Sequence, residues 1–131
     1  MDREPIEVMF IDDEQPFLDV LVKRLKKRNI LACQANSGAD GLACLRREPK
    51  DIVVLDVCMP GMDGLETLRQ IKQENPLSEV ILLTGHACVE AARQGMDEGA
   101  FDYLMKPVEI DDLIYRLEDA YEKIQLMKNR E

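Results

Sequence analysis

The segment DIVVLDVCMPGMDG, at residues 51–64, determines the fold expected of the whole chain. Its four apolar residues, 52–55, lead into one carboxylate at Asp56. A short apolar run bounded by turn residues is typical of a strand buried on both faces, and Pro60 and Gly61 end this one in a loop. Asp56 therefore stands at the carboxyl end of a buried strand, where open α/β sheets place their chemistry. An aspartate there is also a common turn or cap residue, so the segment alone leaves two interpretations.

Similar apolar runs, each followed by a helical pattern, recur along the chain. The helix expected at about 87–97 has the weakest pattern, because Gly95 lies inside it. The helix that begins at Ile110 has the clearest apolar stripe. The pattern predicts strands at 6–11, 30–35, 51–56, 80–83 and 100–104, with a helix after each of them.

Five strand–helix units at this spacing predict an α/β fold with helices on both faces of a parallel sheet. Because such crossovers are right-handed, the sheet is expected to be doubly wound. The flavodoxin-like (βα)5 arrangement, with strand order 2-1-3-4-5, follows from this fold class and not from the periodicity itself. We expect one domain over residues 1–131, with its core at about 5–125.

The overall composition excludes several classes of protein. A hydrophobic content of 46% with 33% charged residues describes a globular chain and not a disordered one. The net charge of -9 argues against direct nucleic-acid binding, which needs a basic face. No apolar run approaches the ~20 residues of a membrane span, and no secretory pattern opens the sequence. A cytoplasmic location is therefore expected.

The four cysteines, Cys33, Cys44, Cys58 and Cys88, are scattered and form no C-x-x-C pair. Structural zinc sites need closer ligand spacing than this, so they are disfavoured. The sequence predicts free cysteines that pack as small hydrophobic side chains in a reducing cytoplasm.

Polar residues follow four of the five expected strands. Asp12 and Asp13 follow the first strand, Asp56 ends the third, Thr84 follows the fourth and Lys106 follows the fifth. If these strands lie side by side, three carboxylates converge and one lysine does not neutralise them. A hard divalent cation such as Mg²⁺, held by carboxylates, a backbone oxygen and waters, suits such an oxygen-rich set. The alternative is that the acidic pair simply starts a helix, where the dipole favours it.

Four motifs in this order and spacing resemble a response-regulator receiver domain of the two-component systems, over nearly the whole chain. They are the acidic pair Asp12-Asp13, LDVCMPGMDG around Asp56, LLTGH around Thr84 and YLMKP around Lys106. The sequence around TGHA and GAFDY is similar to receivers that precede sigma-54 activator ATPases. No such ATPase follows in this chain. The last helix has apolar residues that suit either a coiled coil or packing on its own sheet: Leu113, Leu117, Ala120, Ile124 and Met127.

The resemblance implies that Asp56 accepts a phosphoryl group from a phosphohistidine on a sensor histidine kinase or phosphotransfer protein. Such a domain is a signalling unit that catalyses its own phosphorylation and dephosphorylation, not an enzyme with a separate substrate. Mg²⁺ (or Mn²⁺) would be held directly by Asp13 and Asp56, through a water by Asp12, and by the backbone carbonyl of Cys58. No organic cofactor is implied.

The resemblance also implies a switch. Thr84 and Lys106 would contact the phosphoryl oxygens, and Thr84 together with Tyr103 would change position when phosphate arrives. The surface of helix 4, strand 5 and helix 5 would then meet a partner, an output domain or a second copy of the chain. Cys58 and His86, each two residues after a site residue, would modulate the phosphate lifetime. The Lys106–Pro107 bond is expected to be cis.

Other functions of the same fold fit less well. A flavin-binding module needs a hydroxyl- and glycine-rich loop after the first strand, and this chain has acids there. A haloacid-dehalogenase-type phosphatase needs a second aspartate where Cys58 stands, and no G-x-x-x-x-G-K-[ST] loop supports nucleotide hydrolysis. The alternative that stays open is a pseudo-receiver, which would act as a protein-interaction module without phosphorylation.

Overall fold

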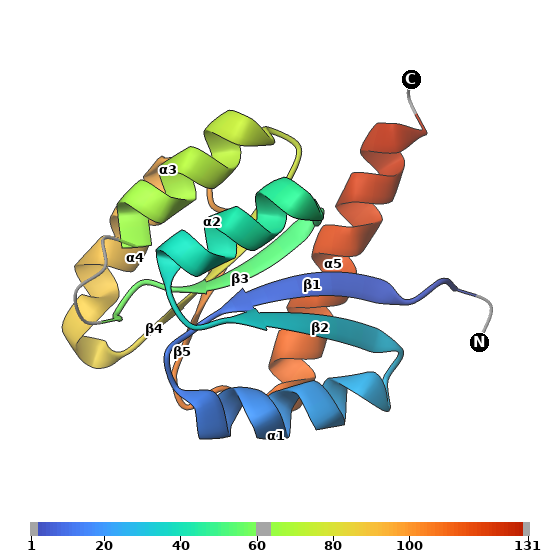
Figure 1. Cartoon of the computed structure of the whole chain (residues 1–131), viewed down its shortest axis with the longest axis horizontal. Helices are drawn as coiled ribbons and strands as arrows, with labels where there is room; N and C mark the ends of the chain where they lie inside the picture. The colour runs from blue at the N-terminus through green and yellow to red at the C-terminus, as the bar shows by residue number, and fades with distance from the viewer. Residues whose placement is uncertain (1–2, 60–63, 130–131) are drawn as a thin grey trace.

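The five strands form one parallel sheet in the order β2-β1-β3-β4-β5, which confirms the predicted arrangement (Figure 1). The structure, a computed structural model, describes residues 3–59 and 64–129. The strands are β1 (Ile6–Ile11), β2 (Ile30–Ala35), β3 (Ile52–Asp56), β4 (Glu79–Thr84) and β5 (Asp102–Met105). The helices are α1 (Gln15–Lys26), α2 (Gly38–Arg47), α3 (Gly64–Glu74), the short 3-10 helix η1 (His86–Cys88), α4 (Val89–Asp97) and α5 (Ile110–Lys128).

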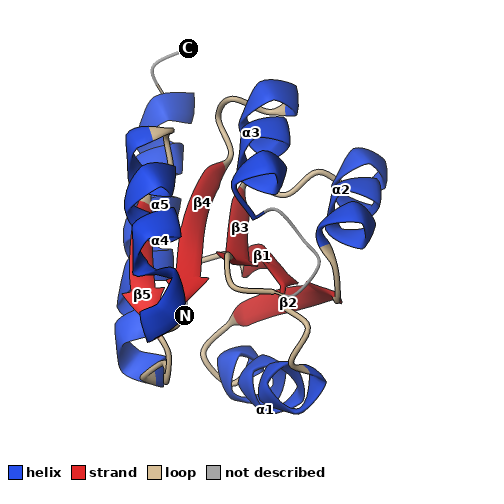
Figure 2. Cartoon of the chain, turned by 90° about the vertical axis from the view of Figure 1, so that its left-hand side faces the viewer, coloured by secondary structure: helices blue, strands red, loops and turns tan. Residues whose placement is uncertain are grey.

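The sheet separates two hydrophobic clusters, because successive side chains of a strand point to opposite faces. Val8 and Phe10 of β1 pack with residues of α1 and α5 on one face. Met9 and Ile11 pack with residues of α2, α3 and α4 on the other. Figure 2 shows the strands lying between these helices. All five residues of β3 are buried, as expected of a central strand covered on both faces.

Two helices begin with residues that suit a helix start. Pro16 lies in the first turn of α1, where its missing N–H costs no hydrogen bond. Ser37 caps α2, since its hydroxyl oxygen accepts a hydrogen bond of 3.1 Å from the backbone N–H of Asp40. The turn residues at 60–63, which include Pro60 and Gly61, lie outside the described part of the chain.

The fifth strand begins two residues later than predicted. Gly99 has φ +107°, which ends α4 in the left-handed conformation that glycine favours. The N–H of Ala100 then donates to the carbonyl of Gly95, so this residue still belongs to the helix end. The apolar run at 100–104 therefore includes residues of the connecting turn, and the hydrophobic pattern alone could not show this.

Helix α4 tolerates its internal glycine because the helix lies very close to the sheet. A Cβ at Gly95 would lie 2.5 Å from Cδ1 of Leu82 on β4, much closer than a van der Waals contact. The weak helical pattern thus reflects close packing, and the predicted helix at about 87–97 is confirmed, with its first residues in η1.

The long helix α5 packs on its own sheet. Four of the residues that suited a coiled coil, Leu113, Leu117, Ala120 and Ile124, are buried in the cluster shared with α1. Met127 is 43% exposed. This arrangement favours the second interpretation of the helix for the described residues. None of the described helices is long and apolar enough to cross a membrane.

The prediction of four free cysteines is wrong for two of them. Cys33 and Cys44 are free, and both pack against the cluster of α2, α3 and α4, as expected. Cys58 and Cys88, however, form a disulfide, with their Cα atoms 5.8 Å apart. The physical reason is topological. Since β3 and β4 are neighbours, the segments that follow their carboxyl ends meet, although 30 residues separate the two cysteines.

Candidate functional site

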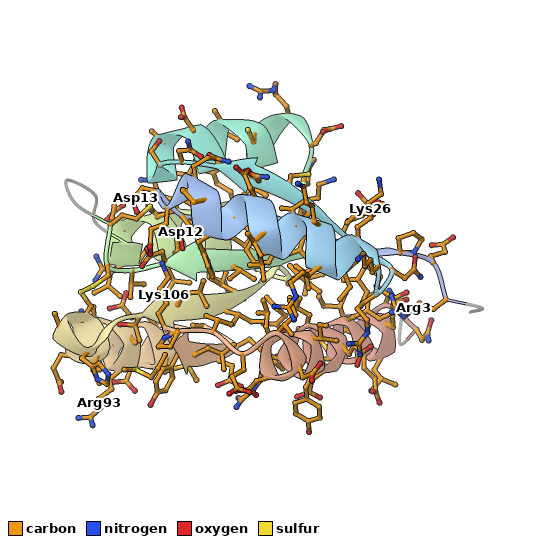
Figure 3. All side chains as sticks on the ribbon, turned by 90° about the horizontal axis from the view of Figure 1, so that it is seen from below. Arg3, Asp12, Asp13, Lys26, Arg93 and Lys106 are labelled. Atoms are coloured by element: carbon orange, nitrogen blue, oxygen red, sulfur yellow. A yellow bond between two sulfur atoms is a disulfide. The ribbon has the colours of Figure 1, made fainter. Side chains whose placement is uncertain are left out.

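The predicted site residues gather at the carboxyl end of the sheet. Asp12 follows β1, Asp56 ends β3, Thr84 ends β4 and Lys106 follows β5. Figure 3 shows Asp12, Asp13 and Lys106 together at one end of the molecule. The backbone N–H of Lys106 donates to the carbonyl of Thr84 at 2.8 Å, which fixes the lysine beside the end of β4.

Three carboxylates meet at this end. One oxygen from each of Asp12, Asp13 and Asp56 lies within 4.8 Å of the others. Asp12 is 1% exposed and Asp56 is 3% exposed, whereas Asp13 is exposed to solvent. Like charges this close are unfavourable unless a cation neutralises them. The cluster that the strand ends predicted is therefore present.

The carboxylate of Asp12 is only partly satisfied. Its Oδ1 accepts a hydrogen bond of 2.9 Å from the N–H of Glu14. Its Oδ2 lies 2.8 Å from Nζ of Lys106, yet this buried oxygen accepts no hydrogen bond of regular geometry. Burial raises the pKa of Asp12, and the neighbouring charge of Asp56 adds to the effect, although Lys106 and the Glu14 amide act in the opposite direction.

Lys106 is the cation that the three carboxylates of Asp12, Glu14 and Asp56 share. Its Nζ lies 3.3 Å from Oδ2 of Asp56 and forms a short ion pair with Glu14. Burial alone would lower the pKa of Lys106, but its contacts with these negatively charged carboxylates outweigh burial and raise the pKa. The ammonium also lies 4.8 Å from the centre of the Phe17 ring. The lysine is thus held in its charged form.

The carboxylate of Asp56 is oriented from two sides. Its Oδ1 accepts a hydrogen bond of 2.8 Å from the backbone N–H of Cys58, and its Oδ2 accepts one of 3.3 Å from Lys106. The Lys106–Pro107 peptide bond is cis, as the resemblance implied. These contacts hold the Asp56 carboxylate in one orientation at the carboxyl end of the sheet.

The residues present fit a hard divalent cation. The donors are carboxylate oxygens, which Mg²⁺ prefers, and one buried oxygen of Asp12 lacks a regular hydrogen bond. A single lysine offsets only part of the charge of the cluster. Asp12, Asp13 and Asp56 are the residues that could hold the ion. The backbone carbonyl of Cys58 as a further ligand stays a prediction.

The predicted switch and modulating residues lie on β4, η1 and β5 and in the segment after β3. Thr84 is completely buried, and its hydroxyl donates to the carbonyl of Gly85 at 3.0 Å. Tyr103 on β5 is half-buried and packs against the cluster of α2, α3 and α4. His86 is exposed in η1. Their roles in switching and in phosphate lifetime stay predictions.

Three residues of the site were not identified from the sequence. Glu14 pairs with Lys106, and the sequence feature that could have indicated it is a third acidic residue directly after Asp12 and Asp13. Phe17 lies under the ammonium of Lys106, and the corresponding feature is an aromatic residue in the first turn of the helix. Cys88 bonds to Cys58. Its signal was the position of both cysteines just past the ends of strands that become neighbours in the 2-1-3-4-5 order.

Comparison with known proteins identifies the family. Residues 8–118 match the response regulator receiver domain. The chain is 37% identical over 118 residues to the DNA-binding transcriptional regulator NtrC of Escherichia coli, which covers 90% of this chain and 25% of NtrC. It is 35% identical over 116 residues to the probable transcriptional regulatory protein TcrX of Mycobacterium tuberculosis, covering 88% of this chain and 50% of TcrX. The chain thus spans between a quarter and a half of these relatives.

Solved structures agree with this identification. A response regulator receiver domain protein from Clostridium thermocellum superposes with a TM-score of 0.87 at 34% identity, covering 92% of this chain and 98% of that one. The receiver domain of NtrX from Brucella abortus gives a TM-score of 0.82 at 30% identity, covering 88% and 98%. With the acidic cluster and the lysine placed as described, this chain belongs to the response regulator receiver domain family.

Proposed function

We propose that this chain is a phosphorylation switch that accepts a phosphoryl group on Asp56 in a Mg²⁺-dependent reaction. The observation that carries the proposal is the buried Asp56 carboxylate, held by Lys106 and the Cys58 amide beside Asp12 and Asp13. A buried carboxylate in one fixed orientation, next to a cation and a cation-binding cluster, suits attack on a phosphoryl donor.

The phosphoryl donor is a phosphohistidine on a sensor histidine kinase or phosphotransfer protein. A carboxylate oxygen of Asp56 attacks phosphorus, the imidazole nitrogen leaves, and an aspartyl phosphate forms. Lys106 pairs with a phosphoryl oxygen as a compact positive charge. Thr84 exchanges its hydrogen bond to Gly85 for one to the phosphoryl group. Hydrolysis of the aspartyl phosphate by water later resets the switch.

The metal ion has one role in this scheme. Mg²⁺ or Mn²⁺, held by Asp12, Asp13 and Asp56, would neutralise charge on the phosphoryl oxygens and on the carboxylates themselves. Without it, a negatively charged phosphoryl donor would approach a site that carries an excess of negative charge. The support is the oxygen-only donor set and the partly satisfied Asp12 carboxylate.

The output of the switch is the surface of α4, β5 and α5. When Thr84 moves, Tyr103 turns inward and α4 shifts, which changes this surface for an output domain, a partner or a second copy. One feature supports a binding role: Tyr115 of α5 is an aromatic side chain that is 65% exposed. Since the chain covers a quarter of NtrC, an output domain of a longer regulator is one such partner.

The direct test is the intact mass of the chain after incubation with acetyl phosphate, in Mg²⁺ or in EDTA. The expected result is a phosphoryl adduct on the unmodified chain in Mg²⁺ and its loss in EDTA. The matched control is Asp56→Asn, which keeps the size of the side chain and is expected to give no adduct. A folded chain without an adduct in Mg²⁺ would contradict the proposal and favour the pseudo-receiver.

The lifetime of the aspartyl phosphate gives a second test. The positions of Cys58 and His86 beside the site predict that they alter the rate of hydrolysis by shielding or orienting the attacking water, without being required for phosphorylation. In reducing buffer, a Cys58→Ala/His86→Ala variant is expected to form the adduct and to lose it at a rate that differs several-fold from the unmodified chain. Equal decay rates would contradict this role.

A further inference from the structure

We propose that Cys58 and Cys88 form a reversible dithiol–disulfide site which, when oxidised, prevents phosphorylation from repositioning α4. This inference rests on the proposed function, because it assigns a regulator to the same site. It concerns a covalent bond between the segment after Asp56 and the residue immediately before α4, the helix that shifts in the proposed function.

The disulfide joins two sets of hydrogen bonds, one that includes Asp56 and one that includes Thr84. On one side, the N–H of Cys58 donates to Asp56 at 2.8 Å. On the other, the N–H of Cys88 donates to the carbonyl of Gly85 at 3.1 Å, and the same carbonyl accepts the hydroxyl of Thr84 at 3.0 Å. The acceptor of phosphate and the residue that responds to it are thus connected through one sulfur–sulfur bond.

The position of this bond suits a regulatory role better than a structural one. Both hydrophobic clusters are assembled from buried side chains of the strands and helices, and the disulfide lies at the edge of one of them. Cys58 and Cys88 are both partly exposed, and the neighbouring His86 and Ala87 are exposed, so a small thiol or disulfide can reach the bond.

Oxidation proceeds by thiol–disulfide exchange with a small-molecule disulfide such as oxidised glutathione. The Cys88 thiolate attacks one sulfur of the oxidant, which forms a mixed disulfide and expels the other sulfur as a thiolate that then takes up a proton. The Cys58 thiolate then attacks the mixed disulfide, which releases the second thiol. Two protein thiols are oxidised, one disulfide of the oxidant is reduced, and an excess of small thiol reverses both steps.

The bond acts on the switch through α4. In the reduced chain, Thr84 can leave the carbonyl of Gly85 for the phosphoryl group, which frees the turn that ends at Cys88 and lets α4 move. In the oxidised chain, Cys88 stays bound to Cys58, whose amide is held by Asp56. Phosphorylation of Asp56 is then not transmitted to α4, although the acceptor itself and the lysine are unchanged.

The first part of the test examines the site itself. A Cys33→Ser/Cys44→Ser variant keeps only the proposed pair, and a Cys58→Ser/Cys88→Ser variant is its matched control with the same number of thiols. Both are equilibrated in glutathione buffers of increasing oxidised fraction. The first variant is expected to lose two hydrogens in intact mass and to yield a linked peptide pair containing Cys58 and Cys88. A chain that stays a dithiol, or that forms only glutathione adducts or dimers, would overturn the proposal.

The second part measures the response of α4. The Cys33→Ser/Cys44→Ser chain, oxidised or reduced, is treated with acetyl phosphate and Mg²⁺, and hydrogen exchange is followed in peptides that cover Val89–Asp97. The change in exchange is divided by the phosphorylated fraction, measured by mass in the same sample. We expect this ratio to be about fivefold smaller in the oxidised chain. The Cys58→Ser/Cys88→Ser control is expected to give the same ratio in both buffers, whatever the lifetime of its phosphoryl group.

The outcomes separate this inference from the proposed function. Equal phosphorylation with an equal α4 response in both redox states would overturn the inference and leave the proposed function intact. An oxidised chain that is not phosphorylated at all would place the effect at Asp56 and would also overturn it. No adduct in the reduced chain would overturn the proposed function, and the regulatory role with it.

Discussion

Lys106 decides how three neighbouring carboxylates coexist. It lies 2.8 Å from Asp12 and 3.3 Å from Asp56, and it also pairs with Glu14. A buried carboxylate that loses its partner is strongly destabilising, because its desolvation is no longer offset. This single side chain therefore contributes both to the stability of the fold and to the charge that a phosphoryl group would meet.

Replacing Lys106 by methionine tests this balance. Without Mg²⁺, Lys106→Met is expected to lower the free energy of unfolding by about 3 kcal/mol. Added Mg²⁺ is expected to recover more stability in the variant than in the unmodified chain, since the ion meets less opposing charge. Urea unfolding with and without Mg²⁺ measures both effects. Lys128→Met is the control: Lys128 pairs with Asp51 at the surface, and its loss should cost less than about 1 kcal/mol. Equal losses in the two variants would contradict this view of Lys106.

At the residue scale, the sequence indicated most of the site. Asp12, Asp13, Asp56 and Lys106 each follow or end a strand, so the topology brought them together as predicted. The Cys58–Cys88 bond was not predictable in the same way. A disulfide forms only if the distance between the two Cα atoms is right to within about 1 Å. Spacing along the chain carries no such information.

Secondary-structure elements fit the sheet closely at the start of α3. A Cβ added to Gly64 would lie 2.8 Å from the backbone Cα of Val57, next to Asp56. Backbone cannot move aside as the end of a flexible side chain can. The glycine therefore allows α3 to begin directly against the segment that follows β3.

A Gly64→Ala substitution is expected to lower the free energy of unfolding by about 1–3 kcal/mol, as overpacking does in other cores. The matched control is Gly85→Ala, where an added Cβ meets no atom within 4 Å and φ is an ordinary -97°. Its effect should stay within about 0.5 kcal/mol. Chemical denaturation of both variants makes the measurement. A neutral Gly64→Ala would show that the start of α3 can move away from Val57.

At the element scale, sequence patterns located all five strands but not every boundary. The predicted start of β5 was two residues too early. Gly99 ends α4 in a left-handed conformation, and the first residues of the apolar run at 100–104 belong to the turn that follows it. The weak pattern of α4 had a structural cause, the close approach of Gly95 to Leu82, that only the packed structure reveals.

The whole molecule carries a net charge of -9, and its acidic cluster at the carboxyl end of the sheet concentrates part of it. A ligand that binds only the folded chain stabilises it according to its concentration relative to its dissociation constant. Cation binding should therefore be visible as a change in global stability, independently of any phosphorylation.

Mg²⁺ at about 100 times its dissociation constant is expected to raise the free energy of unfolding by about 2.7 kcal/mol. Thermal unfolding in MgCl₂, compared with NaCl of equal ionic strength, separates site binding from general screening. In Asp13→Asn, whose side chain is exposed and therefore replaceable without loss of packing, most of this gain should disappear. An equal gain in NaCl, or in the variant, would exclude a specific cation site.

The order 2-1-3-4-5 was expected from the fold class, since periodicity identifies strands without saying which of them are neighbours. The packing of α5 on its own sheet was an open alternative that the burial of its apolar stripe decided. The strand order places Asp12, Asp13, Asp56 and Lys106 at one end of the sheet.

An amide NMR spectrum of the reduced chain with Mg²⁺, recorded before and after addition of acetyl phosphate, would show directly whether phosphorylation reaches α4. We expect chemical-shift changes at the carboxyl ends of β1 and β3 and, beyond them, through η1, α4 and β5, with α2 and the amino ends of the strands unchanged. Phosphorylated protein whose changes stop at the immediate neighbours of Asp56, with α4 and β5 unaffected, would contradict the claim that this domain is a switch.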